Sequence, residues 1–384
     1  MSWDLTKVPS LAKSMGATAK GVHSDSEEVI DTEMFKYEAD QLVEESGILP
    51  FLHCFAVDAF TEDGIIKGVI TESKSGRNAI LAKRVIDSTG DADIAAYAGA
   101  PYTKSKKKEL MGVTQMFSCR GVKKSEFEDY IKNVLKPTYS DWAGEIWKQK
   151  IDNKETAIMF SPYIEKPFVQ AQKEGFIPKE ENITIGGTWG AISDEGDATQ
   201  LNLIFIRNID CTDIIDLTRA EVRGRQNALY AIKVLNKYVP GFQKARLRNF
   251  GMTIGTRESR KIEGQYYLTE NDVKNQARFE DSIGIFPEFI DGCGTIILPL
   301  TGRYFQVPYR ALVPKKIDNL LVAGRAISGD RIAHCAFRNI SCCILTGQAA
   351  GTAAAVSIKN GTSTSSVNIS DVQQALIRQG VRIK

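Results

Sequence analysis

The stretch of residues 318–356 constrains the fold more than any other part of the chain. A short apolar run at residues 320–322 stops at Ala323-Gly324, as a buried strand does where it meets a turn. Residues 340–358 then carry no charge and are rich in small side chains, which predicts a helix. One face of that helix carries Gly347, Ala350, Gly351 and Ala354, and such small residues let a helix approach a sheet or a ligand closely.

A polar turn lies between the predicted strand and the predicted helix. It contains Gly329, Asp330, His334, Arg338 and Asn339. The first N–H groups of a helix have no partner within the helix and carry partial positive charge, so the start of this helix can bind an electron-rich ligand. These residues alone indicate a ligand at a helix N-terminus and nothing more specific.

Three segments resemble the FAD-dependent oxidoreductase family, a group of glutathione-reductase-like flavoproteins related to the flavin subunit of heterodisulfide reductase. Residues 84–102 read RVIDSTGDADIAAYAGAPY, residues 255–273 read GTRESRKIEGQYYLTENDV, and residues 318–356 are the third segment. Their order and spacing both match, and the resemblance extends from Asp31 to about Val356. It implies an oxidoreductase whose cofactor is FAD.

The resemblance also implies roles for individual residues. The chain would pass beneath the cofactor at Thr89 and Gly90, and the start of the last helix would stabilise negative charge on the reduced flavin ring. The residues implied to contact FAD are Thr89, Gly90, Gly324, Arg325, Gly329, Asp330, Arg338 and Asn339.

One expected element is missing from the sequence. The dinucleotide-binding domain of this family opens with a strand, a G-x-G-x-x-G turn and a helix, whose backbone N–H groups hold the pyrophosphate. Residues 186–190 have the wrong spacing, and Gly292-Cys293-Gly294 precedes a strand instead of following one. We expect an N-terminal truncation; supply of the element by another polypeptide and loss of FAD binding are the alternatives.

The fold class expected is α/β with mixed α+β character. It consists of an incomplete, Rossmann-like FAD-binding domain of glutathione-reductase type with an antiparallel β-meander and an inserted substrate domain. The expected boundaries are an irregular lead-in at 1–30, the partial FAD-binding domain at 31–109, the substrate or cap domain at 110–312, the FAD-contacting segment at 313–358 and a tail helix at 359–384.

Local patterns predict the elements within these domains. Three strands at 51–59, 65–71 and 79–83 form the meander, with a hairpin turn at Thr61-Glu62-Asp63-Gly64, and residues 85–86 close it. Helical periodicity and end signals predict helices over 31–47 and 219–238. Further strands are expected at 183–185, 201–206, 305–307 and 309–313. Trp189 and Asn202 are candidates to line a substrate pocket, with core packing the favoured interpretation for Trp189.

Arg257 and Arg260 are the candidates for binding an anionic substrate. They stand three positions apart, so on a helical turn they share a face, and two guanidinium groups there bind a carboxylate or phosphate well. The alternative is structural, with ion pairs to Glu258 or Glu263. The resemblance places this arginine-rich turn at the border of the active site.

His334 is the candidate proton donor, because its imidazole titrates near neutral pH and we expect it in the turn before the flavin-facing helix. A structural role is the alternative. Cys335 has no partner cysteine at close spacing in the sequence, so we expect it to be small, buried and inert. Asp91 is expected to cap the helix that follows it, in preference to contacting the flavin.

Composition bounds the partners. The net charge of +2 offers no electrostatic case for nucleic acid or an anionic membrane. Seven scattered cysteines show no metal-site spacing and indicate a reduced, cytoplasmic protein without a metal. Polar residues interrupt the apolar segment at 340–358, so we expect a buried helix there and not a membrane span. Homo-oligomerisation is left open.

The sequence therefore favours an FAD-dependent oxidoreductase that transfers a hydride between flavin and a small, anionic or polar substrate. The alternative is a truncated or degenerate, non-catalytic scaffold or subunit that needs another polypeptide to bind FAD. Its support is the missing G-x-G-x-x-G element.

Overall fold

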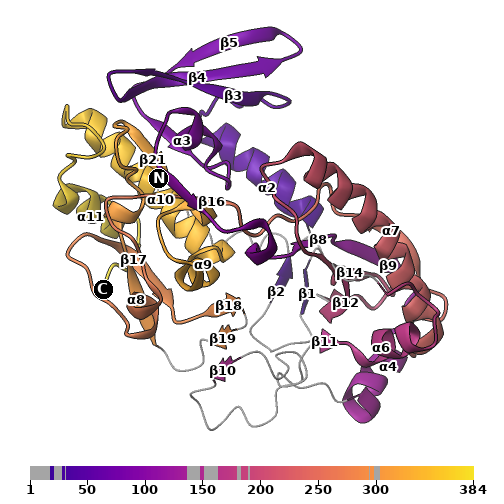
Figure 1. Cartoon of the computed structure of the whole chain (residues 1–384). Helices are drawn as coiled ribbons and strands as arrows, with labels where there is room; N and C mark the ends of the chain where they lie inside the picture. Colours follow the sequence, from indigo (N-terminus) through magenta and orange to yellow (C-terminus); the bar gives the residue numbers. More distant parts are fainter. Residues whose placement is uncertain are drawn as a thin grey trace.

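The computed structural model describes residues 18–20, 28–30, 32–135, 148–150, 163–179, 183–188, 191–293, 295–297 and 303–384. Asp31, where a predicted helix begins, and Trp189, a candidate pocket residue, lie outside these ranges. The described chain mixes helices and strands. Figure 1 shows a sheet with the long helix α7 on one side of the molecule and the helices of the C-terminal part on the other.

Two short parallel strands join the early and late parts of the chain. Strand β6 (Val85–Asp87) pairs with β21 (Leu320–Val322), with Val85 opposite Leu320 and Asp87 opposite Val322. Residues 85–86 therefore pair with the C-terminal segment, and the prediction that they close the meander is wrong. Both strands are followed by short helical turns, α3 (Asp93–Tyr97) after β6 and η5 (Gly324–Ala326) after β21.

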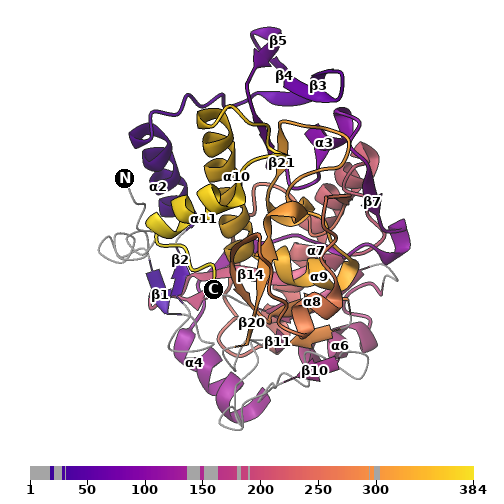
Figure 2. The same cartoon turned by 90° about the vertical axis from the view of Figure 1, so that its left-hand side faces the viewer.

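The antiparallel meander forms as predicted, in the order β3-β4-β5. Its strands are β3 (Phe55–Glu62), β4 (Ile65–Ser73) and β5 (Gly76–Leu81), so the first begins four residues later than expected. Asp63 and Gly64 have φ values of 50° and 75°, the left-handed pair that a two-residue hairpin requires. Figures 1 and 2 both show the meander standing away from the rest of the molecule.

A seven-stranded antiparallel sheet fills the middle of the chain, covered by the long helix α7 (Ile214–Tyr238), which Asp213 caps. Its path runs β11-β12-β14-β9-β15, with β8 and β13 also paired to β14. The strands are β8 (Val113–Thr114), β9 (Phe117–Arg120), β11 (Tyr163–Ile164), β12 (Ile183–Thr188), β13 (Ala191–Ile192), β14 (Ala198–Ile206) and β15 (Arg246–Phe250). Helices α4 (Lys124–Asp129), η2 (Tyr130–Leu135) and α6 (Lys166–Lys173) accompany them.

The C-terminal part packs around the hairpin of β17 (Ser282–Pro287) and β20 (Tyr304–Pro308). Its helices are α8 (Glu270–Lys274), α9 (Arg331–Phe337), α10 (Ile340–Lys359) and α11 (Ile369–Arg378). Residues 309–311 form the 3-10 turn η4 (Tyr309–Ala311) and not the expected strand. The reason is Asp281, whose carboxylate and carbonyl accept hydrogen bonds from the N–H groups of Arg310 and Tyr309.

Four smaller pairings and two further elements complete the described chain. The pairings are β7 (Tyr102–Lys104) with β16 (Arg260–Ile262), β18 (Ile290–Gly292) with β19 (Thr295–Ile297), β19 with β10 (Lys148–Lys150), and β1 (Thr18–Lys20) with β2 (Glu28–Ile30). The β1–β2 pair lies within residues 1–30, which were predicted to be irregular, so part of this segment forms strands. The other elements are α2 (Thr32–Glu45), where a helix was predicted, and η1 (Lys107–Glu109).

The described hydrophobic side chains divide into separate cores. One lies within residues 113–254, and a second joins residues 268–313 to the chain beyond residue 321. The chain thus changes core near residue 255, well before the boundary expected at 312. Helix α10 belongs to the second core and contacts α9, α11, β6, β17 and β21. It is the one helix in the described ranges with the length and apolar composition to cross a membrane, and 44% of that window is buried.

The parallel pair at the centre of the fold depends on apolar burial. Leu321→Ala is expected to lower the free energy of unfolding by about 2–5 kcal/mol, because Leu321 is fully buried and the change leaves a cavity. The midpoint of urea unfolding measures this. Leu81→Ala is the control: the Leu81 side chain is 70% exposed, and the expected change is within about 0.5 kcal/mol. Equal shifts for both variants would contradict the assigned core.

Candidate functional site

A cavity of about 450 Å³ lies where the carboxyl ends of β6 and β21 meet the start of α10. Ligands of open α/β sheets bind at such strand ends. A larger groove of about 560 Å³ lies at the amino ends of the same strands, beneath the meander, and is more open to solvent. The cavity is therefore the better candidate, and its wall is formed by Ser88, Gly90, Thr256, Arg257, Ala323, Gly324, Arg325, Arg338, Ile340, Cys343, Ile344 and Gly347.

The guanidinium of Arg325 lies directly on the backbone of Gly90. A Cβ at position 90 would come within 2.6 Å of the Arg325 Cζ, and φ of Gly90 is 81°, so only glycine suits this position. Arg325 Nη2 donates to Asp91 Oδ1 at 2.9 Å and to Thr256 Oγ1 at 2.7 Å. One side chain thus joins the ends of two strands to the segment around residue 256.

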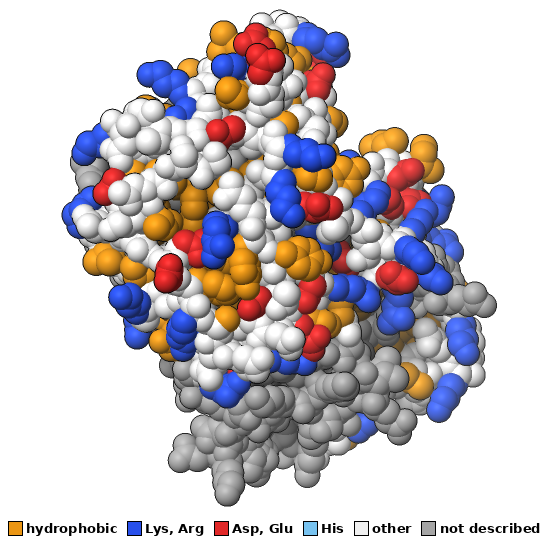
Figure 3. Space-filling model, turned by 60° about the vertical axis from the view of Figure 1, so that its left-hand side comes forward, with side chains coloured by type: hydrophobic (Ala, Val, Ile, Leu, Met, Phe, Trp, Pro, Cys, Tyr) orange, Lys and Arg blue, Asp and Glu red, His pale blue; other side chains and the backbone are white. Residues whose placement is uncertain are grey.

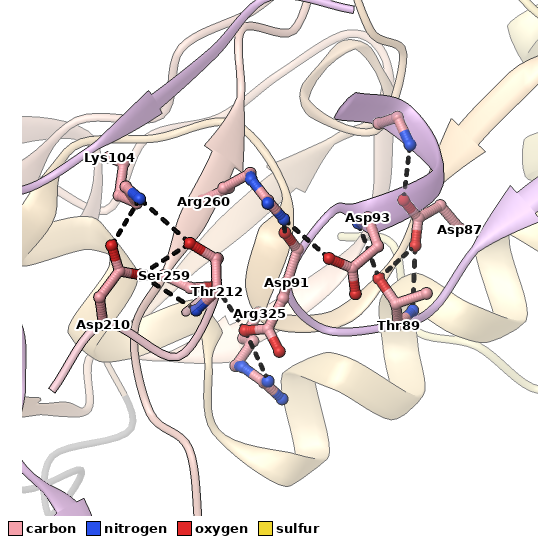
Figure 4. A network of polar contacts seen from close by, with 11 residues as sticks. Asp87, Thr89, Asp91, Asp93, Lys104, Asp210, Thr212, Ser259, Arg260 and Arg325 are labelled. Atoms are coloured by element: carbon pink, nitrogen blue, oxygen red, sulfur yellow. Dashed lines mark hydrogen bonds and ion pairs between the residues drawn. The ribbon is translucent and has the colours of Figure 1, made fainter. Parts of the chain in front are cut away.

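The loop after β6 is held by its own acidic side chains (Figure 4). Asp87 accepts hydrogen bonds from Thr89 and from the N–H of Ala95, and Thr89 Oγ1 accepts from the N–H of Asp93. Thr89 therefore contributes to the loop and does not line the cavity, whereas its neighbour Ser88 does. The expectation that Asp91 caps the helix is wrong, because Asp91 pairs with Arg325 and accepts from Ser259 Oγ.

Arg257 and Arg260 point to different places. Residues 256–259 are irregular and Arg260 begins strand β16, so the helical turn expected here is absent. Arg260 Nη1 contacts Asp93 Oδ1 at 2.7 Å and the carbonyl of Asp91 at 3.1 Å (Figure 4). The ion-pair partner of Arg260 is therefore Asp93, and neither Glu258 nor Glu263, which the sequence offered as structural partners. Arg257 alone of the two lines the cavity.

Arg257 has no carboxylate in contact with its guanidinium among the described residues. Its Nη2 lies 3.4 Å from Asn202 Oδ1, and its Cζ lies 4.8 Å from the centre of the Phe205 ring. Burial, with the positive charge of Arg338 nearby, lowers the pKa of Arg257 to about 10, so it stays protonated at neutral pH. The wall also holds Arg325 and Arg338 but no Asp or Glu. Asp91 and Asp291, outside the wall, pair with Arg325 and Arg338, so Arg257 is the wall arginine whose charge has no carboxylate in contact with it among the described residues.

The start of α10 also faces this cavity. Arg338 Nη2 contacts Asp291 Oδ2 at 3.1 Å. Asn339 stands at the N-cap of α10 without capping it: its amide donates instead to the carbonyls of Cys335 and Ala336, at 3.1 and 2.7 Å. Among the described residues, no side chain therefore caps the first N–H groups of α10, and Ile340, the first residue of the helix, lines the cavity.

Gly324 lines the cavity, whereas Gly329 and Asp330 directly precede helix α9. The N–H of Gly324 donates to Thr346 Oγ1 at 3.0 Å, which holds the strand end against α10. Asp330 Oδ1 caps α9 through the N–H groups of Ile332 and Ala333. Of the residues predicted from the sequence, the structure brings Gly90, Arg257, Gly324, Arg325 and Arg338 to the wall, and not Thr89, Arg260, Gly329, Asp330, His334 or Asn339.

His334 lies in helix α9, so its expected place in a turn is wrong. The side chain is only 1% exposed, and its Nε2 lies 3.0 Å from the carbonyl oxygen of Arg257. Burial, together with the positive charge of Lys261, holds the pKa of His334 well below its usual value of 6.5. The neutral ring therefore fixes the backbone of Arg257 from inside the core.

Sequence reasoning missed several residues of the wall. Ile340, Cys343 and Ile344 precede Gly347, which was predicted to face a sheet or a ligand, at helical spacing, so the face of α10 that meets the cavity could have been extended to them from that period. Cys335 does have a partner: its Sγ lies 3.2 Å from Cys293 Sγ, which the separation of 42 positions concealed. Among the described residues, no group of three or more His, Cys, Asp or Glu could hold a metal ion.

Comparison with known proteins gives one extended match. A family described as FAD dependent oxidoreductase matches residues 7–376. No curated protein matches the chain.

The solved structures that match this chain share little sequence with it. The flavin-dependent brominase Bmp2 is 11% identical (TM-score 0.42, 97% of this chain and 70% of that chain). The myxobacterial, FAD-dependent chondrochloren halogenase CndH is 9% identical (TM-score 0.43, 98% and 67%). A geranylgeranyl bacteriochlorophyll reductase-like protein of Thermoplasma acidophilum is 11% identical (TM-score 0.41, 92% and 61%).

Gly90→Ala is expected to destabilise the protein more than Gly99→Ala. Both glycines have positive φ, 81° and 84°, so each change brings backbone strain of about 1–2 kcal/mol. A Cβ at position 99 meets open space, whereas at position 90 it displaces the Arg325 guanidinium and so breaks its bonds to Asp91 and Thr256. Urea unfolding of both variants measures the difference; equal midpoints would mean that the Arg325 contact contributes nothing.

His334 is expected to make the protein less stable in acid. Its folded-state pKa lies well below 6.5, so below pH 6.5 the unfolded state binds the proton that the folded state excludes. The contribution of His334 is therefore lost as pH falls from 6.5 towards the folded pKa, by up to about 1.4 kcal/mol per pH unit. His334→Gln, which can still donate to the Arg257 carbonyl, should show a flatter dependence of urea midpoint on pH in this window. Parallel curves would contradict this assignment.

Proposed function

The chain belongs to the FAD dependent oxidoreductase family, with FAD as cofactor, and from this premise we propose that it transfers a hydride between flavin and a small, anionic or polar substrate. The reaction site proposed is the cavity between β6, β21 and α10. The single observation that carries the proposal is the wall of this cavity, which combines Arg257, Arg325 and Arg338 with an uncapped helix start and contains no acidic side chain.

The residues around the cavity fit one end of FAD. Gly90 and Gly324, both with positive φ, end the two parallel strands without side chains that would fill the space. Within the described chain, Arg325 Nε and Arg338 Nε are buried and have no hydrogen-bond partner. We propose that Ser88, Gly90, Gly324 and Arg325 hold the cofactor, with the first N–H groups of α10 beside its electron-rich edge. We propose a glutathione-reductase-like plan for this arrangement.

When bound, FAD supplies the hydride chemistry, and the protein supplies position and charge. Arg257 is proposed to bind the anionic group of the substrate, because its guanidinium contacts only the neutral Asn202 and Phe205 in the described chain. Charged hydrogen bonds from a planar guanidinium orient a carboxylate well. Arg338 adds positive charge to the same wall while Asp291 fixes its position.

His334 is proposed as a positioning residue. Its ring holds the carbonyl of Arg257, so it orients the backbone from which the Arg257 side chain extends. A role as proton donor to substrate has less support, because the ring is almost fully buried and its pKa is far below neutral. Arg260 is likewise proposed to hold the loop after β6 through Asp93.

A small molecule is the proposed partner, with neither nucleic acid nor membrane involved. Figure 3 shows acidic and basic side chains interspersed over one face. All seven cysteines are free, which favours the reducing cytoplasm. Whether the protein forms a homo-oligomer is left to measurement.

The decisive experiment is the visible absorption spectrum of the purified protein, before and after addition of FAD. Flavin that remains bound through gel filtration supports the proposal. A colourless protein that takes up no FAD would favour the second candidate, a non-catalytic scaffold or subunit that needs another polypeptide. The observation behind that candidate is the absence of a G-x-G-x-x-G motif from the sequence.

Arg257→Met is expected to weaken binding of a small dicarboxylate to the flavin-loaded protein. Malonate is the probe, and its binding is followed through the change it causes in the bound flavin's spectrum. Loss of one charged hydrogen-bonding group is expected to raise Kd about 10–100-fold. Arg219→Met, which removes an exposed arginine on α7, should leave Kd unchanged. Equal malonate affinity in both variants, with flavin still bound, would overturn the role of Arg257 but not that of the cavity.

A further inference from the structure

Two thiols that are distant in the sequence meet beside helix α9. Cys293 follows strand β18 and Cys335 lies on α9, and their Sγ atoms are 3.2 Å apart. The bond of a disulfide is ~2.0 Å, so the sulfurs need to approach by only about 1.2 Å to be joined. Cys335 Sγ also lies 3.3 Å from the Arg331 carbonyl, which orients it within the helix. Neither Cys293 nor Cys335 lines the cavity described above.

The backbone on the Cys293 side is shaped to admit the second thiol. Gly292 has φ of 144°, and a Cβ there would lie 2.8 Å from Cys335 Sγ, so any larger residue would displace that thiol. Cys293 itself has φ of 54°, a conformation that residues with side chains rarely adopt and that costs about 1–2 kcal/mol. Such local strain is common at sites with a function.

The two thiols differ in accessibility and charge. Cys335 is fully buried, whereas Cys293 is partly exposed. Donation from the Cys335 S–H lowers the pKa of Cys293, with help from Arg331 and Arg338 and against partial burial and the negative charge of Glu258. The pKa of Cys335 is raised by that hydrogen bond and by burial. Cys293 is thus suited to react first and Cys335 to react second.

We propose that Cys293 and Cys335 form a reversible disulfide, with a peroxide as the oxidant. The Cys293 thiolate attacks the O–O bond of hydrogen peroxide: an S–O bond forms, the O–O bond breaks, and the departing hydroxide takes a proton to become water. The Cys335 sulfur then attacks Cys293, so that an S–S bond forms, the S–O bond breaks, and the hydroxyl leaves with the Cys335 proton as a second water. Two thiols are oxidised and one peroxide is reduced.

The disulfide would tie α9 to β18 beside an existing contact. Arg338, just after α9, already bonds to Asp291 on β18. A covalent link at positions 293 and 335 would hold the same two elements and so restrain an arginine of the cavity wall. The thiol chemistry itself does not depend on the function proposed for the cavity.

The test is a titration of the folded, reduced full-length protein with hydrogen peroxide, followed by alkylation and non-reducing peptide mass spectrometry. The expected result is a peptide pair linked through Cys293 and Cys335, lighter by two hydrogen atoms and restored by dithiothreitol. It should appear at peroxide concentrations that leave the buried Cys119, Cys211 and Cys342 unmodified. Recovery of Cys293 and Cys335 as separate alkylated or over-oxidised peptides would overturn the proposal.

Two variants separate the roles of the thiols. In Cys335→Ser the sulfenic acid of Cys293 should persist and be captured by dimedone, and in Cys293→Ser the buried Cys335 should stay unmodified. Cys343→Ser is the matched control, because Cys343 is also partly exposed but bonds only to backbone carbonyls, and the linked peptide should be unchanged. Faster oxidation of Cys335 than of Cys293 would contradict the assigned order. If either variant fails to fold, the wild-type peptide pair decides the question.

Discussion

The contact of Arg325 with Gly90, Asp91 and Thr256 is the interaction on which the rest of the site depends. These contacts join three segments: the loop after β6 with Gly90 and Asp91, residues 256–260 with Thr256, and the end of β21 with Arg325 itself. The pair with Asp91 is partly buried, so removal of either charge would leave the other poorly solvated. A glycine beneath the guanidinium lets the three segments approach closely enough for a ligand cavity to form at their meeting point.

A polar network holds the segment at residues 256–260 and so positions one unpaired charge, the guanidinium of Arg257. Ser259 and Arg260 are fixed by Asp91 and Asp93, and Glu258 is fully buried but accepts from Ser105, Met111 and Lys261. A buried network is stabilising when its members are satisfied. Both carboxylate oxygens of Glu258 have partners, whereas Arg260 Nε is buried without a hydrogen-bond partner in the described chain. The contacts of Glu258, Ser259 and Arg260 therefore hold the backbone next to Arg257, and we propose that the Arg257 guanidinium binds an anion.

Local patterns predicted the elements that depend on local physics. The meander followed from the Asp63-Gly64 turn, and α10 followed from an uncharged run of small residues. The site was predicted less well, because its geometry depends on distant partners. Arg257 and Arg260 diverge since β16 pairs with β7, more than 150 positions earlier. His334 could have been placed in a helix from the capping signal at Asp330, whereas the neighbour of Cys335 had no local signal.

The pairing of β6 with β21 also dictates the order in which the molecule can assemble during translation. Asp91 and Arg325 are 234 positions apart, so nascent β6 has no partner until nearly the whole protein has left the ribosome. The core within residues 113–254 is contiguous and can form earlier, since domains generally fold as units while synthesis proceeds. An emerging β6 would thus remain exposed to chaperones and proteases, and the ligand cavity would be the last part of the fold to appear.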